Sequence, residues 1–167
     1  MMAHRAMCFA RQVHRDHKRK YTGAPYTDHL AEVAGIVGSL YASTLGCNYV
    51  MTVAWLHDTI EDCGVTRGQL EEEFTSEVAN GVLMLSDLET TGNRAERKAA
   101  SRIRLAAAKP WIQDIKCADL ISNTQSIVEY DPKFAVTYLE EKRLLLDVLT
   151  KADRRLWNMA RELAEAA

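Results

Sequence analysis

Apolar residues recur every three or four positions along most of the chain, the spacing that gives an α-helix one buried face. The helices that this spacing predicts cover, approximately, residues 3–18, 27–41, 48–61, 66–74, 76–88, a segment that ends before Pro110, 110–129 and 132–165. No segment alternates apolar and polar residues as a β-strand does. The predicted fold is therefore all-α, a compact bundle of about seven or eight helices.

Residues that favour helix ends support several of these boundaries. Thr66 and Gln69 resemble a capping box, in which each side chain bonds the other residue's backbone N–H. The last stretch, 132–165, is one long helix or two, because the polar residues 153–155 could interrupt it. The segment 88–98 is expected to be an exposed loop that leads into the next helix. In the second helix, Gly35 and Gly38 are expected to allow close packing of a neighbour.

Length and charge narrow the classes of function. At 167 residues the chain fits a single domain, residues 1–167, with a full hydrophobic core. Its formal net charge of −2 offers no field for holding a nucleic-acid polymer or an anionic membrane, which favours a small ligand or a protein partner. The absence of an apolar signal segment or membrane span indicates a cytoplasmic location. The four cysteines are interpreted as reduced, mostly buried thiols. The sequence is compatible with a homo-oligomer.

The string HDTIED ends the otherwise apolar helix over 48–61, and four ionisable side chains converge in it. On a helix, His57 shares a face with Glu61, and Asp58 shares the adjoining face with Asp62. Three carboxylates this close would repel one another unless a cation neutralised them. An imidazole beside carboxylates suits manganese, iron or zinc better than calcium. The alternative is a helix end with solvated acids.

Two further residues are candidate ligands for the same ion. Asp119 interrupts an apolar helix, with Asn123 one turn further on the same face. His29 comes shortly after a turn that contains Gly23 and Pro25, where the backbone can hold it facing the core. Either residue could instead be a hydrogen-bonded structural side chain. The other three histidines, on the basic first helix, are interpreted as solvated or packing residues: His4, His14 and His17.

The order of PYTDH, LHDTIED and IKCADLISN resembles the HD-domain phosphohydrolases, specifically the hydrolase domain of the RelA/SpoT family and its stand-alone small alarmone hydrolases. The resemblance covers about residues 3 to 130. It implies that the metal ligands are His29, His57, Asp58 and Asp119, and that the catalytic carboxylates are Glu61 and Asp62. It also implies Mn²⁺, although another divalent transition metal could serve, and removal of the 3′-pyrophosphate of ppGpp to leave GDP or GTP.

Substrate contacts carry over less directly from this resemblance. The family's basic pair before the Gly-x-Pro-Tyr turn falls on Arg19 and Lys20, but the loop is one residue longer here, so Lys18 and Arg19 compete for the role. The string AERK resembles a segment that supplies cationic groups near the substrate phosphates. The remaining substrate-binding candidates are Arg97, Lys98, Asn123 and Tyr138.

Two other functions compete with alarmone hydrolysis. One metal site can serve many phosphate esters, so the chain could be a phosphatase of a nucleoside monophosphate, a deoxynucleoside triphosphate or the 2′-phosphate of NADPH. Retention of both Glu61 and Asp62 favours the pyrophosphohydrolase. A non-enzymatic nucleotide-binding protein would be expected to lose a ligand or an acid, and none is lost.

Overall fold

The computed structural model describes residues 1–87 and 91–166, and within these it contains helices only, apart from a single isolated β-bridge between Lys18 and Pro25. The helices are α1 (Met2–Val13), α2 (Tyr26–Tyr41), α3 (Cys47–Leu56), α4 (Thr59–Cys63), α5 (Arg67–Glu73), α6 (Ser76–Leu85), α7 (Arg94–Ala107), α8 (Pro110–Tyr130), α9 (Pro132–Leu146) and α10 (Arg154–Glu165). The all-α prediction is confirmed. The chain divides into two compact units, Met1–Ser86 and Asp87–Ala167.

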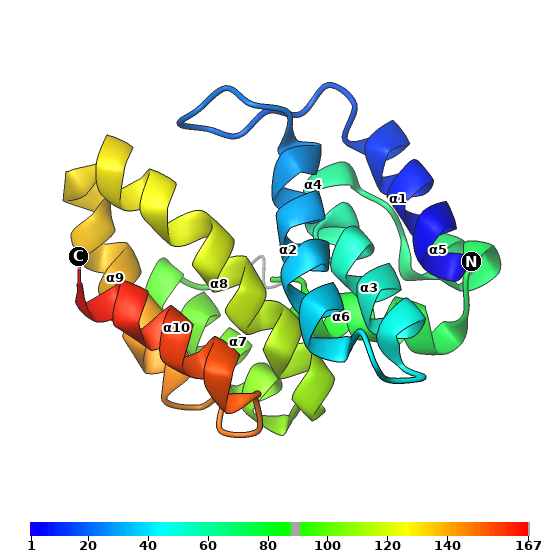
Figure 1. Cartoon of the computed structure of the whole chain (residues 1–167). Helices are drawn as coiled ribbons and strands as arrows, with labels where there is room; N and C mark the ends of the chain where they lie inside the picture. Colours follow the sequence, from blue (N-terminus) through cyan, green and yellow to red (C-terminus); the bar gives the residue numbers. More distant parts are fainter. Residues whose placement is uncertain (88–90, 167) are drawn as a thin grey trace. The chain divides into compact units, whose positions relative to one another are not determined.

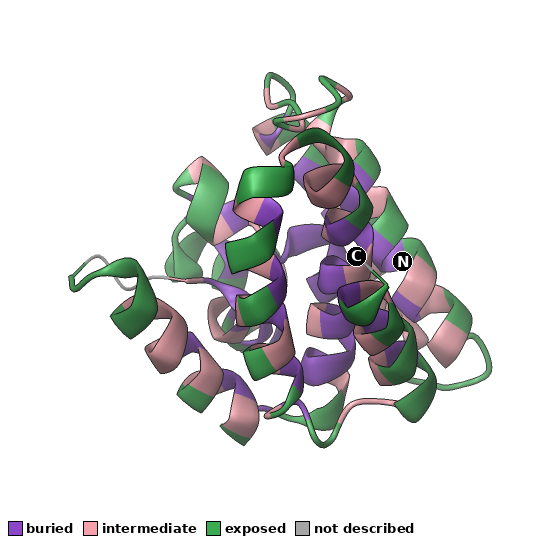
Figure 2. Ribbon diagram, turned by 90° about the vertical axis from the view of Figure 1, so that its left-hand side faces the viewer, coloured by how far each residue is buried: buried purple, intermediate pink, exposed green. Residues whose placement is uncertain are grey.

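Helix α3 is the centre of the first unit, where α1, α2 and α6 pack against it (Figure 1). Its Val50, Val53 and Leu56 are buried, as the apolar sequence predicts. Helix α1 brings only small side chains into its fully buried positions, Ala6 and Ala10. Figure 2, coloured by burial, shows that helices have buried residues on one face and exposed residues on the opposite face. The unit therefore places the end of α3 in its interior.

One glycine accounts for the close approach of α2 and α3. A Cβ atom added to Gly38 would lie 3.2 Å from the sulfur of Met51 on α3, closer than ordinary van der Waals contact. A Cβ atom at Gly35 would meet nothing within 4 Å. The expected packing role therefore belongs to Gly38, and the expectation for Gly35 is wrong.

In the second unit, α8 packs against both α9 and α10, and α7 packs against α9. The stretch over 132–165 forms two helices, because Asp153 caps α10 by accepting a hydrogen bond from the backbone N–H of Arg155. The buried amide of Gln113 on α8 donates to the Leu105 carbonyl at 2.9 Å and accepts from the Lys151 backbone N–H at 2.8 Å. No helix of the described part of the chain is long and apolar enough to cross a bilayer.

Three expected boundaries are wrong. The first helix ends at Val13, because the polar HRDHKRK that follows offers no apolar face to bury. The segment over 88–98 is helical from Arg94 onward, since Asn93 and Glu96 form a capping box that starts α7; residues 88–90 lie outside the described residues. The helix expected over 48–61 is broken into α3 and α4, so ten helices are described where seven or eight were expected.

We expect Gln113→Leu to lower the free energy of unfolding by about 1 to 2 kcal/mol, because it leaves the Lys151 backbone N–H without its partner and removes one hydrogen bond to the Leu105 carbonyl, which keeps the one from the Ala108 N–H. Chemical denaturation measures the loss. The same substitution at the exposed Gln125 of α8 should change stability by less than about 0.5 kcal/mol. Equal effects at the two positions would contradict the role of the buried amide.

Candidate functional site

The break between α3 and α4 falls on two candidate ligands, His57 and Asp58. His57 is the residue after the last turn of α3, and Asp58 precedes α4 without capping it through its side chain. Helix α4 ends at Gly64, whose positive φ of 66° is the left-handed conformation that favours glycine. Because the side chain of Asp58 makes no hydrogen bond to the start of α4, its carboxylate is available to the histidines.

The protonation of His57 follows from its neighbours. Its Nδ1 lies 2.7 Å from the Ala54 carbonyl, which can only accept a hydrogen bond, so Nδ1 carries the proton. The Nε2 of a neutral ring then presents a lone pair, and it lies 3.0 Å from Oδ2 of Asp58, which is also an acceptor. Two lone pairs at this distance repel unless a proton or a cation lies between them. The geometry fits a metal ion held by both groups.

His29 and Tyr26 of α2 complete this arrangement in the first unit. The Nε2 of His29 lies 3.5 Å from the same Asp58 oxygen, and its buried ring meets the His57 ring edge to face at 5.2 Å. The Tyr26 hydroxyl donates to that oxygen at 2.7 Å. Tyr26 orients the carboxylate as an outer-shell partner orients a metal ligand. The structure therefore brings His29, His57 and Asp58 together around one point.

The charge of Asp58 suits a ligand. Burial by itself would raise the pKa of this carboxyl, but a proton carried by His57 or His29 on the nitrogen that faces Asp58 holds the pKa well below its usual range. Asp58 is consequently a carboxylate, the form that binds metals.

The two proposed catalytic acids lie on α4, one turn beyond the ligands. Both Glu61 and Asp62 are exposed. Partial desolvation and the negative charge of Asp58 raise the pKa of Asp62, which makes it a better proton acceptor than an ordinary aspartate. Asp62 lines an open hollow together with Lys18 and Tyr26, so solvent reaches this carboxylate.

The fourth candidate ligand, Asp119, belongs to the second unit. Its two oxygens accept hydrogen bonds from Lys116, at 2.8 Å, and Asn123, at 2.6 Å, both on α8. Asn123 thus fixes the carboxylate of a residue one turn away, as a structural side chain would. Asp119 also lines a cavity of about 280 Å³ built entirely from the second unit.

This cavity is rich in charge. Its lining includes three of the substrate-binding candidates, namely Lys98, Asn123 and Tyr138. The basic side chains at its wall are Arg94, Lys98, Arg102, Lys116 and Lys142, against the acids Asp87, Asp119 and Glu141. Several of these groups are ion-paired across the wall, with Arg94 on Glu141 at 2.6 Å and Lys98 on Asp87 at 2.7 Å. The excess of cations suits an anionic ligand such as a phosphate ester.

The remaining substrate candidates lie elsewhere. Arg97 is half-buried and donates to the Gly92 carbonyl, and it does not line the cavity. In the first unit, Arg19 is mostly covered, 3.7 Å from Glu32, whereas Lys20 is exposed beside Tyr21. Lys18 lines the hollow that reaches Asp62. The two alternatives for the basic pair thus differ in surroundings, with Lys18 nearer the acidic residue.

Sequence reasoning missed two side chains at these sites. Tyr26 lies inside the PYTDH string, three residues before His29, and this helical spacing could have predicted that the two side chains share a face. Lys142 lies in the charged run EEKR, which is typical of a solvated face, yet it is 1% exposed. Its amine donates to Thr124 at 2.5 Å, and burial lowers its pKa to about 8. No sequence pattern distinguishes this lysine from a surface one.

Comparison with known sequences places these residues in a known context. A profile of the HD domain family matches residues 6–126. A Synechocystis protein called a probable guanosine-3′,5′-bis(diphosphate) 3′-pyrophosphohydrolase is 33% identical over 77% of this chain and 17% of its own length. A Mycobacterium leprae probable GTP pyrophosphokinase is 32% identical over 91% of this chain and 19% of its own. The chain thus spans less than a fifth of these curated relatives.

Solved structures share the fold. A structure described as a metazoan ortholog of SpoT that hydrolyzes ppGpp superposes with a TM-score of 0.87, at 22% identity, over 99% of this chain and 94% of the other. A Listeria monocytogenes protein superposes with a TM-score of 0.69, at 21% identity, over 88% and 98%. At these identities the likeness concerns the fold.

We expect Tyr26→Phe to weaken Mn²⁺ binding by about 10-fold or more, because the variant loses the hydroxyl that orients Asp58. Equilibrium dialysis with metal analysis gives the affinity. Tyr130→Phe, at an exposed position, is the matched control and should bind as the wild type does. Unchanged affinity in Tyr26→Phe would show that Asp58 needs no such support.

The lowered pKa of Lys142 predicts a pH-dependent stability. Between pH 8 and 10.5 the unfolded chain holds this proton more tightly than the folded chain, so the free energy of unfolding rises with pH across that window. Relative to Lys142→Met, the wild type should gain about 3 kcal/mol from the low to the high end. Denaturation at both pH values tests this. Lys133→Met, at an exposed lysine, is the control, and its free energy of unfolding should change with pH as that of the wild type does. If the wild type gained as much relative to Lys133→Met as relative to Lys142→Met, the prediction would be contradicted.

Proposed function

The chain belongs to the HD domain family, and we propose that it is a cytoplasmic Mn²⁺-dependent hydrolase that removes the 3′-pyrophosphate of guanosine, or adenosine, tetra- and pentaphosphate alarmones. The observation that carries the proposal is the pair of facing acceptors on His57 and Asp58, which calls for a cation. The substrate class is supported by the names of relatives about one third identical to this chain.

The proposed ligand set is His29, His57, Asp58 and Asp119. The first three converge within the first unit. Asp119 is proposed from its sequence motif, and the HD domain match supports treating both units as one catalytic domain because it runs across their boundary. Two imidazoles and two carboxylates suit a transition ion such as Mn²⁺. When bound, such an ion lowers the pKa of a coordinated water and supplies hydroxide near neutral pH.

Glu61 and Asp62 are proposed to orient the attacking water and accept its proton. The raised pKa of Asp62 and its position on a solvent-accessible hollow support that role. Release of intact pyrophosphate requires that water attack the phosphorus attached to the ribose 3′-oxygen. The bond from that phosphorus to the 3′-oxygen breaks, and the oxygen takes up a proton as the nucleoside 5′-diphosphate or 5′-triphosphate leaves.

Binding of the anionic substrate is proposed to use charge-assisted hydrogen bonds from basic side chains. The cavity of the second unit offers Lys98 together with Asn123 and Tyr138. In the first unit, the basic loop offers Lys18, Arg19 and Lys20. Arg97 of the second unit, which is half-buried and lies outside the cavity lining, is proposed as an outer contact.

The proposal is tested by incubating the protein with ppGpp, pppGpp, ppApp, NADPH, deoxynucleoside triphosphates and nucleoside monophosphates, with Mn²⁺ or with chelator. We expect pyrophosphate to be released from the alarmones when Mn²⁺ is present and not when chelator is present. Release of orthophosphate from another nucleotide would show that the chain is a hydrolase with a different substrate. The absence of any product would favour a non-enzymatic nucleotide-binding protein.

Substitution of the acids should separate metal binding from turnover. Glu61→Gln and Asp62→Asn are expected to lower kcat by about 10² to 10⁴-fold while metal content stays at the wild-type level. Asp58→Ala and Asp119→Ala should lose metal and activity together. Glu72→Gln, an exposed acid of α5, is the control. Full turnover in both acid variants would remove Glu61 and Asp62 from the mechanism.

A further inference from the structure

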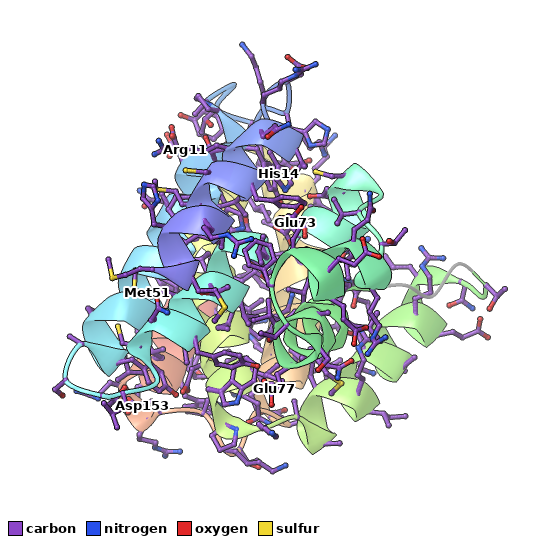
Figure 3. The ribbon with its side chains drawn as sticks, turned by 90° about the vertical axis from the view of Figure 1, so that its right-hand side faces the viewer. Arg11, His14, Met51, Glu73, Glu77 and Asp153 are labelled. Atoms are coloured by element: carbon purple, nitrogen blue, oxygen red, sulfur yellow. The ribbon has the colours of Figure 1, made fainter. Side chains whose placement is uncertain are left out.

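Three side chains outside the proposed catalytic set converge between the end of α1 and the end of α4. These are His14, His17 and Cys63, and one ligand atom of each lies within 4.8 Å of the others. The Nδ1 atoms of the two histidines are 3.2 Å apart, and the sulfur of Cys63 lies 3.9 Å from Nδ1 of His17. Figure 3 shows His14 beside α1, on the side of the first unit where these segments meet.

His14 is held in a buried position where its ring nitrogen faces that of His17. The residue is 1% exposed, and its ring stacks on Tyr26 with centroids 5.0 Å apart. Its Nδ1 faces another Nδ1, so a hydrogen bond between them uses the lone pair of only one of the two rings. A cation would use the lone pairs of both rings and the sulfur at once.

The spacing fits a tetrahedral ion. Zinc–nitrogen bonds of about 2.0–2.1 Å and zinc–sulfur bonds of about 2.3 Å place two nitrogens about 3.3 Å apart and a nitrogen and a sulfur about 3.6 Å apart. The distances of 3.2 Å and 3.9 Å in the cluster lie within a few tenths of an ångström of these values. The third pair, His14 and Cys63, lies within 4.8 Å, so the three ligand atoms can surround one centre after side-chain adjustment.

An ion could also reach this cluster from solvent. His17 lines the same open hollow as Asp62, with Asp16 and Lys18 beside it. Water or one of these carboxylates can occupy the fourth position, which suits a site with three protein ligands.

We propose that His14, His17 and Cys63 form a second metal site that binds a thiophilic divalent cation such as Zn²⁺, separate from the oxygen- and nitrogen-donor set around Asp58. The thiolate distinguishes the two sites, since sulfur ligands select zinc over manganese. The bound ion would link the chain after α1 to the end of α4, next to Asp62. The proposal does not depend on the identity of the substrate.

Cobalt(II) is the probe, because a cobalt–thiolate bond gives a charge-transfer band in the near ultraviolet that nitrogen and oxygen ligands do not give. Titration of the wild-type chain with Co²⁺ should produce this band. Cys63→Ser should lose the band. His17→Gln should lose the band or no longer reach its full intensity at one equivalent of Co²⁺, whereas His57→Ala should keep it. Cys8→Ser, at an exposed cysteine, is the matched control and should also keep it.

Metal analysis after dialysis against Zn²⁺ gives a second readout, in which Cys63→Ser and His17→Gln should each hold one equivalent less than the wild type. Far-ultraviolet circular dichroism shows which variants are folded, and His17→Gln keeps a polar side chain if Cys63→Ser fails to fold. The proposal is overturned if the wild type gives no thiolate band, if the band persists in Cys63→Ser, or if it disappears in Cys8→Ser.

Discussion

The first unit is organised around a single electrostatic conflict, the lone pair of His57 directed at the carboxylate of Asp58. The Ala54 carbonyl fixes the proton of His57 on Nδ1, and Tyr26 holds the facing oxygen of Asp58. Neither group can turn away without giving up a buried hydrogen bond. The interruption between α3 and α4 is the backbone feature that makes this arrangement available, because a continuous helix would direct both side chains along its own surface.

In the second unit, charge is handled by pairing. Asp87, Glu141 and Asp119 each accept a hydrogen bond from a cation at the cavity wall. The buried amine of Lys142 donates instead to the Thr124 hydroxyl and to the Leu120 carbonyl. The wall is thus largely neutral at close range and retains a basic excess for an incoming anion.

Much of this architecture could be predicted from the sequence, and the limits have physical causes. Helical periodicity identified the buried α3, and the order of three motifs predicted the HD domain family that the profile match confirms. The break at His57 could not be predicted, because the spacing of apolar residues indicates which positions are buried and contains no information on the interactions of polar side chains. His14 is buried, within the expectation of a solvated or packing residue, but its meeting with His17 and Cys63 depends on where α1 ends. The expectation of mostly buried cysteines is wrong, since only Cys117 is buried.

The division into two units also orders events during synthesis. Residues 1–86 form a compact body of their own, built from helices that are neighbours in sequence, and such N-terminal units are the first to leave the ribosome. His29, His57 and Asp58 therefore leave the ribosome before Asp119 does. The three side chains that converge in the first unit can thus take up their arrangement before the fourth proposed ligand is available.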